Sequence, residues 1–71
     1  GELKMIVCHE NDFERAEYHA EKIAQVNTNC RLYLQPEWSE RKKLTPLIVE
    51  YIKQHPKWKI SQQTHKYIDI R

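Results

Sequence analysis

Glycine is nearly absent from this chain. Its 71 residues include a single glycine, at position 1, and three prolines. Loops that bind phosphate through backbone amides need glycines inside the chain, so P-loops and dinucleotide-binding loops are excluded. The G-x-S-x-G motif of hydrolases is excluded for the same reason.

Cysteine is scarce as well, with Cys8 and Cys30 alone. No CxxC or HExxH spacing occurs, so we predict no metal site in this chain. Both cysteines lie in apolar, strand-like runs, and we interpret them as buried free thiols in a reducing compartment. A Cys8–Cys30 disulfide is the alternative if the two strands are neighbours. Nothing in the pattern brings either thiol next to His9 or His65, so a nucleophilic cysteine has little support.

Charge and hydropathy exclude two classes of partner. Twelve basic and ten acidic residues give a net charge of +2, which is too small and too scattered for a nucleic-acid-binding surface. No apolar run approaches the ~18 residues of a membrane span, and no signal peptide is recognised. We therefore expect a cytoplasmic protein with neither nucleic acid nor membrane as a partner.

Three apolar runs predict β-strands: Leu3–Cys8, Cys30–Gln35 and Trp58–Gln62. The first run is nearly continuous and contains β-branched residues, which is typical of a strand buried on both faces. Pro36 is expected to end the pairing of the second strand.

Two helices are predicted between these strands. Apolar residues recur every three or four positions from Phe13 to Ala24, and Asn11 is the expected N-cap. For the second helix, we expect Thr45 as the cap and Pro46 in the first turn. A start near Ser39 is the alternative, with Pro46 inside the helix. His55-Pro56 should end this helix, and the tail 63–71 shows no clear period.

The order β-α-β-α-β predicts a single α/β domain over residues 1–71, with three parallel strands and right-handed crossovers. Ligands of parallel sheets bind at the carboxyl ends of the strands. Three polar segments fall there: Cys8–Glu10, Gln35–Trp38 and Gln62–His65.

Individual polar and aromatic residues leave several interpretations open. We expect His19 to face solvent and His9 and His55 to have structural roles, whereas His65 is equally compatible with structure and function. Trp38 and Trp58 favour core packing over ring stacking with a ligand. Three glutamines could read the edge of a heterocycle or face solvent: Gln35, Gln62 and Gln63.

Two segments carry a resemblance to a known family. "LQPEW" (34–38) and "HPKWKISQQTHKYIDIR" (55–71) resemble the end of the 7-carboxy-7-deazaguanine synthases of the radical S-adenosylmethionine superfamily, and the opening "LKMIVCHENDFERA" is similar as well. The resemblance implies the last three strands of an incomplete TIM-like barrel. It further implies a lyase that converts 6-carboxy-5,6,7,8-tetrahydropterin to 7-carboxy-7-deazaguanine, in the pathway to queuosine in tRNA.

The resemblance also implies roles for particular residues and cofactors. His65 and the terminal carboxylate of Arg71 match groups that contact the pterin substrate, and Gln35 matches a residue near S-adenosylmethionine. The family uses S-adenosylmethionine, a [4Fe–4S] cluster and Mg²⁺, and a homodimer is implied for the whole enzyme. The cysteine motif that binds the cluster is absent here, since such clusters need at least three closely spaced thiolates. The chain alone is therefore expected to be inactive and to need the remainder of the barrel as its partner.

A free-standing α/β binding or interaction module without catalysis is the alternative. A chain this short buries too little surface to be firmly stable without a staple, a metal, a partner or more of its own protein. A barrel segment would leave open strand edges that favour self-association, whereas a true module would cover them.

Overall fold

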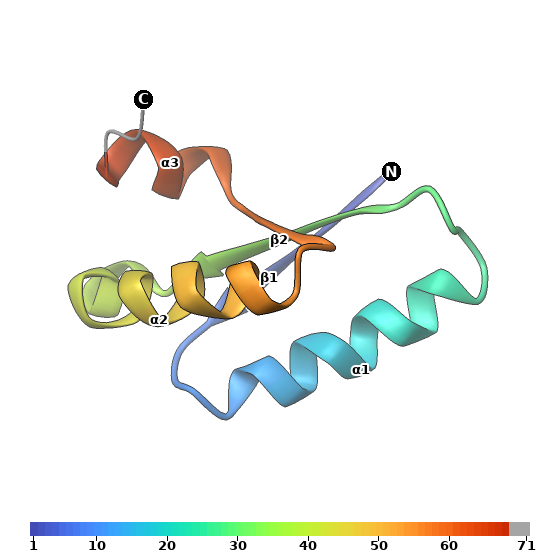
Figure 1. Ribbon diagram of the computed structural model, residues 1–71, viewed down its shortest axis with the longest axis horizontal. Coiled ribbons are helices and arrows are strands. Elements are labelled where there is room, and N and C mark those ends of the chain that lie inside the picture. Colours follow the sequence, from blue (N-terminus) through green and yellow to red (C-terminus); the bar gives the residue numbers. More distant parts are fainter. Residues whose placement is uncertain (69–71) are drawn as a thin grey trace.

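The three predicted strands and two predicted helices are present, together with two further short helices. A computed structural model describes residues 1–68. The elements in chain order are β1 (Glu2–Val7), α1 (Asp12–Ala24), β2 (Arg31–Pro36), the 3₁₀ helix η1 (Trp38–Glu40), α2 (Arg41–Gln54), β3 (Trp58–Ile60) and α3 (Gln62–Ile68), as Figure 1 shows.

The strands form an open parallel sheet in the order β1-β2-β3. Met5 lies opposite Leu34, and Leu34 lies opposite Ile60 in the next strand. Each connection between neighbouring strands contains a helix, as parallel pairing requires. The predicted α/β class with a β-α-β-α-β order is therefore confirmed.

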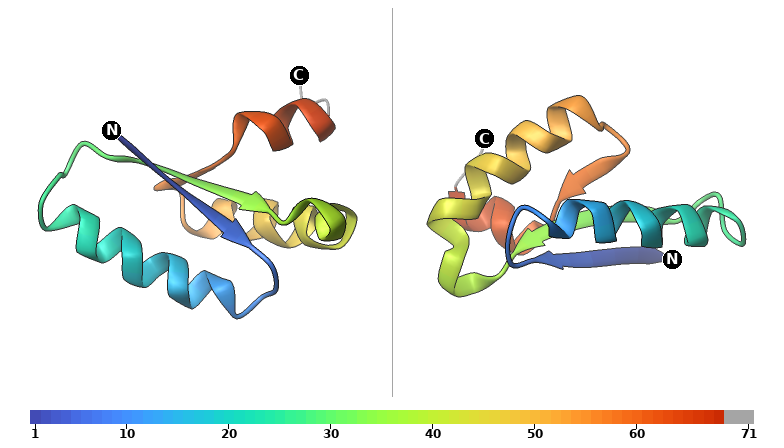
Figure 2. Two further views of the ribbon diagram at one scale, coloured as in Figure 1. Left: turned by 180° about the vertical axis from the view of Figure 1, so that it is seen from behind. Right: turned by 90° about the horizontal axis from the view of Figure 1, so that it is seen from below.

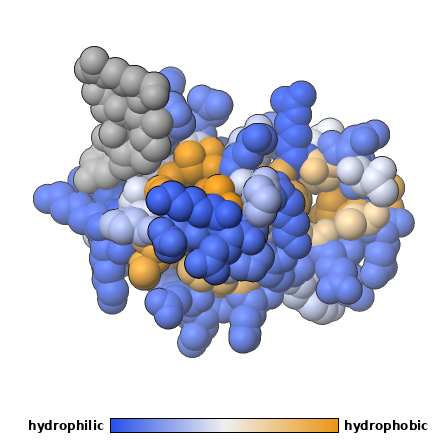
Figure 3. Space-filling view, in the orientation of Figure 1, coloured by the Kyte–Doolittle hydropathy of each residue, from blue (hydrophilic) through white to orange (hydrophobic). Residues whose placement is uncertain are grey.

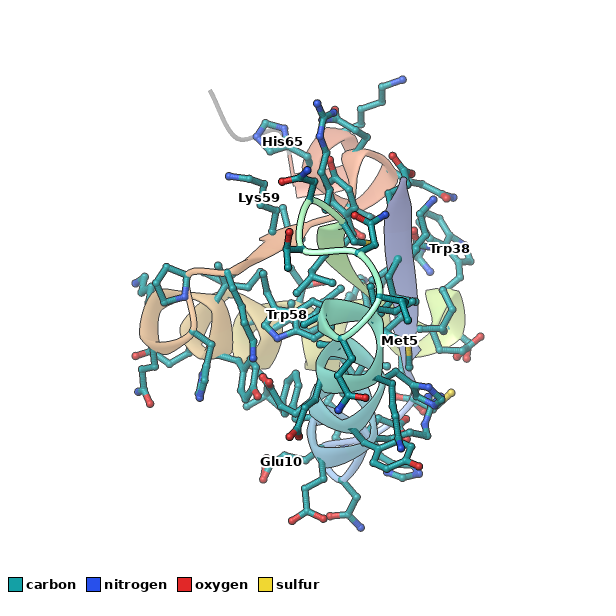
Figure 4. All side chains as sticks on the ribbon, turned by 90° about the vertical axis from the view of Figure 1, so that its right-hand side faces the viewer. Met5, Glu10, Trp38, Trp58, Lys59 and His65 are labelled. Carbon is teal, nitrogen blue, oxygen red and sulfur yellow. The ribbon has the colours of Figure 1, made fainter. Side chains whose placement is uncertain are left out.

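Helices cover the two faces of the sheet unequally. Helices α1 and α2 lie on one face and α3 lies on the other, as Figures 1 and 2 show. The core fills the space between the sheet and the first two helices, where Figure 4 shows Met5 and Trp58. Its buried members are Met5, Val7, Ala16, Ala20, Leu34, Leu44, Ile48 and Trp58.

Strand β1 is buried on one face only, which corrects the prediction of burial on both. Met5 and Val7 face the helices and are buried, but Lys4 is exposed and Ile6 retains 40% of its accessible surface. The strand lies at an edge of the sheet, and within residues 1–68 no strand pairs with its outer side. The continuous apolar run of β1 therefore does not indicate burial on both faces, because Ile6 stays exposed on the face opposite the helices.

The turn before α1 is closed by Asp12 and not by the predicted cap Asn11. Asn11 adopts a helical backbone and its side chain makes no capping hydrogen bond. The Asp12 carboxylate instead accepts hydrogen bonds from the backbone amides of Cys8, at 2.7 Å, and His9, at 3.3 Å. The amide of Cys8 contributes most to a lowered pKa of the Asp12 carboxyl.

Helix α2 begins four residues before the predicted cap. Thr45 lies inside the helix and is 7% exposed, so it is not the cap, and Pro46 stands in the helix interior on the exposed side. The alternative start near Ser39 is the correct one. Proline removes one backbone hydrogen bond, but the preceding 3₁₀ turn and the burial of Leu44 and Ile48 hold this segment in helical form. The helix ends at Gln54, before His55-Pro56, as predicted.

A single carboxylate connects the two large helices to β3. Glu17 of α1 accepts hydrogen bonds from the Tyr51 hydroxyl of α2 and, at 2.8 Å, from the indole N–H of Trp58. The Lys57 ammonium lies 2.5 Å from its second oxygen. Partial burial raises the pKa of Glu17, but the bonds from Lys57, Tyr51 and Trp58 outweigh this effect and hold the pKa below 4.5. The same burial, with the Glu17 contact, raises the pKa of Tyr51.

We expect Glu17→Gln to lower the free energy of unfolding by about 1–3 kcal/mol at neutral pH, because charge-assisted hydrogen bonds are lost. The lowered pKa means that the contribution of Glu17 is present above the ordinary value of 4.5 and is lost as the pH falls through the folded-state value. The variant should therefore lose less stability on acidification. Urea unfolding followed by circular dichroism at several pH values measures both effects.

Glu21→Gln, one turn later on the exposed side of α1, is the matched control and should change the stability by less than about 0.5 kcal/mol. Equal losses in the two variants would contradict a special role for Glu17.

Candidate functional site

The carboxyl ends of the three strands lie at one edge of the sheet, as the parallel order requires. Short backbone bonds tie these ends together. The amide of Glu37, after β2, donates to the carbonyl of Val7 at 2.7 Å, and the amide of Ser61, after β3, donates to the carbonyl of Leu34 at 3.0 Å. Loops that carry polar side chains are therefore fixed relative to one another at this edge.

Helix α3 places His65 above the carboxyl ends of the strands. This helix was not predicted from the sequence. The helix covers 62–68, within the tail that showed no clear period. Ser61 is fully buried and caps it, because its hydroxyl accepts a hydrogen bond from the amide of Thr64 at 3.2 Å. The hydroxyls of Ser61 and Thr64 are also paired, at 2.9 Å. The available signal was a serine, a preferred N-cap residue, directly before this segment.

A small hollow lies between the end of β2 and the start of α3. Its walls are formed by Gln35, Pro36, Trp38, Arg41, Gln63 and Thr64, and its volume is about 10 Å³. That is room for about one water molecule. Among the described residues, no donor reaches the buried Oε1 of Gln35. The hollow thus contains an acceptor that a water or a ligand donor would satisfy.

A stacked pair stands beside the hollow. The guanidinium of Arg41 lies 3.9 Å from the ring centre of Trp38 and donates to the Trp38 carbonyl at 2.7 Å. Trp38 is 53% exposed, so its predicted core position is wrong, whereas the buried Trp58 confirms the same prediction. Trp38 follows the carboxyl end of β2 and begins the 3₁₀ helix, outside the core between the sheet and the helices. The sequence did not predict that Arg41 would lie at the carboxyl ends of the strands.

The predicted site residues are brought together in part. Gln35 is half-buried and lines the hollow. The hollow is also lined by Gln63 and Thr64, the two residues that precede His65. His65 itself is half-buried on α3 and does not line the hollow. Figure 4 shows His65 and Lys59 on the side of the molecule away from Glu10. Arg71 lies outside the described residues.

The two cysteines cannot hold an iron–sulfur cluster together. Cys8 follows the carboxyl end of β1, whereas Cys30 precedes the opposite end of β2. Both thiols are free, so the alternative disulfide is not formed, and Cys8 is exposed, which corrects the predicted burial. Within residues 1–68, no three histidine, cysteine or acidic side chains are grouped as a metal site requires. These residues do not fit a [4Fe–4S] cluster.

Two of the remaining histidines agree with their predictions, and the structural role expected for His9 stays a prediction. His19 is exposed on α1, as predicted. The His55 ring stacks on Tyr51 with centres 4.0 Å apart, and its Nδ1 lies 3.0 Å from the Tyr51 carbonyl oxygen. His9 is exposed in the turn after β1. In the described part of the chain, no helix is both long and apolar enough to cross a membrane.

We expect Ser61→Ala to cost about 1–2 kcal/mol of unfolding free energy, because α3 loses its cap and the buried Thr64 hydroxyl loses its partner. Amide hydrogen exchange should accelerate in 62–66 more than in α1. Ser39→Ala, at an exposed hydroxyl, is the control. Unchanged protection of α3 in Ser61→Ala would show that the cap does not hold the helix.

Comparison with known proteins gives one recurrent match. A 7-carboxy-7-deazaguanine synthase of Flavobacterium psychrophilum is 49% identical over 69 residues, which are 97% of this chain and 31% of that protein. The synthase of Synechocystis is 43% identical over 71 residues, covering 100% of this chain and 32% of that protein. The synthase of Burkholderia multivorans is 32% identical over 70 residues, which are 99% of this chain and 30% of that protein.

No protein-family model matches the chain, and no solved structure matches it. The chain spans about a third of the length of the relatives that it matches. Over nearly all of its length, the sequence therefore resembles one segment of the 7-carboxy-7-deazaguanine synthases, as predicted, and it is consistent with a C-terminal segment of such an enzyme.

Proposed function

We propose that this chain is the C-terminal segment of a 7-carboxy-7-deazaguanine synthase and forms part of the wall of its active site. Identity of 49% along 97% of the chain is the observation that carries the proposal. The enzyme would convert 6-carboxy-5,6,7,8-tetrahydropterin to 7-carboxy-7-deazaguanine. This segment would contribute contacts to the pterin and to part of S-adenosylmethionine, while the chemistry starts elsewhere in the enzyme.

The open sheet supports a place at the end of an incomplete TIM-like barrel. Helices α1 and α2 lie on one face, as the outer helices of a barrel do, and β1 has an unpaired outer edge within the described residues. In a barrel, the preceding strand of the enzyme would pair with that edge. The exposed face with Lys4 and Ile6 would then turn inward.

The three site residues would act by hydrogen bonding and charge. His65 and the terminal carboxylate of Arg71 would bind the pterin, since a carboxylate can accept paired hydrogen bonds from an amide and an amine. Gln35, whose Oε1 is buried without a donor among the described residues, would accept a hydrogen bond from S-adenosylmethionine. Each group binds and orients a ligand, and none is assigned a proton or electron transfer.

S-adenosylmethionine, the [4Fe–4S] cluster and Mg²⁺ would be held mainly by the remainder of the enzyme. Cys8 and Cys30 lie at opposite ends of the sheet, so this segment supplies no cluster site. The whole enzyme would be a cytoplasmic homodimer that uses neither nucleic acid nor a membrane as a partner. The segment by itself would be inactive.

The role of His65 is tested in a full-length chimera, in which this chain replaces the matching segment of the Flavobacterium psychrophilum relative. We expect His65→Ala to raise the KM for the pterin about tenfold or more, because a hydrogen bond to the substrate is lost. His19→Ala, at an exposed position on α1, is the control. Removal of residues 65–71 should abolish turnover, and full activity after this truncation would refute the proposed function.

A free-standing binding module is the alternative. The exposed Ile6 of β1 allows an experiment that distinguishes a barrel segment from such a module. If the chain is a barrel segment, we expect the isolated 71 residues to associate as their concentration rises, because an open strand edge pairs with other edges. Light scattering after size exclusion measures this association. Ile6→Lys should reduce it, whereas Val26→Lys, at a side chain 83% exposed beyond α1, should not. A monomer at every concentration would favour the module.

A further inference from the structure

A continuous groove runs along the junction of α1 and α2, on the face away from His65. Three adjoining hollows of about 420, 420 and 400 Å³ form it. The first and second share Glu10 and Leu47, and the second and third share Phe13 and Tyr51. Because neighbouring hollows share walls, they make one elongated surface and not three separate pockets.

The floor of the groove is apolar and aromatic. Phe13 and Tyr51 stack with ring centres 4.1 Å apart and planes within 4°, and they form its middle. Leu47 retains 36% of its surface at one side, and Tyr18 retains 58% at the far end. In the view of Figure 3, polar side chains cover most of the surface and apolar side chains show only between them, so an apolar floor of this length is unusual for the molecule. Side chains of this kind bind other apolar side chains when a partner covers them.

The rim of the groove is acidic. Half of the ten acidic residues of the chain line it: Glu10, Glu14, Glu17, Glu21 and Glu50. Lys43 and His9 also line the groove, and two of its glutamates have lysine partners: Lys57 pairs with Glu17 and Lys53 with Glu50. The chain as a whole carries +2, so this negative strip differs in sign from the molecule that bears it.

We propose that this groove docks an amphipathic helix of another protein, with leucine-like side chains on one face and lysine or arginine on its flanks. Apolar side chains would lie over Phe13, Leu47 and Tyr51, as in other helix-in-groove complexes. Basic flanks would meet Glu14, Glu21 and Glu50, which steer and orient the helix. The inference rests on the groove alone and is independent of the proposed catalytic role.

The probe is a fluorescein-labelled peptide of about 18 residues, long enough to form a helix, with leucines at three- and four-residue steps and lysines elsewhere. Fluorescence anisotropy measures its binding to the 71-residue chain, at a concentration where the chain is monomeric, and to the full-length chimera. A peptide of the same composition without the apolar stripe should bind at least about tenfold more weakly. Equal binding of the two peptides would overturn the proposal, because charge alone would explain it.

Two variants locate the binding surface. Leu47→Ser should weaken binding about tenfold, since it removes the exposed apolar contact in the floor. Glu14→Gln with Glu50→Gln should weaken it about fivefold, whereas the matched pair Glu2→Gln with Glu40→Gln, at exposed glutamates outside the groove, should not. Thermal unfolding by circular dichroism confirms that each variant is folded.

Three further outcomes would overturn the proposal. Variants of the groove that bind the striped peptide normally would show that it docks elsewhere. Binding by the 71-residue chain but not by the chimera would show that the enzyme's own remainder fills the groove. A dimer of the chain that Leu47→Ser converts to a monomer would assign the groove to a second copy. Loss of activity in His65 variants affects none of these results, so the two proposals fail separately.

Discussion

The hydrogen bonds to Glu17 are the constraint on which the rest of this small structure depends. One carboxylate connects α1, α2 and β3 through Tyr51, Trp58 and Lys57. The indole of Trp58 is the largest fully buried side chain, and its N–H needs an acceptor inside the fold. An unpaired donor there would cost about 1–3 kcal/mol, a large fraction of the stability of a chain of this size.

The position of the candidate site follows from this constraint. Trp58 begins β3, and its burial against the helices sets the register of that strand beside Leu32. Only one residue, Ser61, separates the end of β3 from α3. The place of His65 above the strand ends is therefore fixed by a chain of contacts that starts on the opposite face of the sheet.

The three strands and the two large helices could be predicted because each is marked by its own local apolar pattern. The errors occur where one side chain decides between two local solutions. Asp12 and Asn11 are both good capping residues, and hydrogen bonds back to the β1 turn select Asp12. Burial of Leu44 and Ile48 overrides the signal of Pro46. The tail lacks a helical period because α3 is short and is held by its cap, and the place of Gln35 in a hollow depends on residues far along the chain.

Four backbone amides at the strand ends are engaged within the protein. Asp12 accepts from those of Cys8 and His9, and the amides of Glu37 and Ser61 bond to carbonyls of the neighbouring strands. A ligand at this edge can therefore be read by side chains such as Gln35, but not by these main-chain groups. Selectivity built in this way is easily altered during evolution, because single replacements at the rim can retune it while the scaffold beneath stays unchanged.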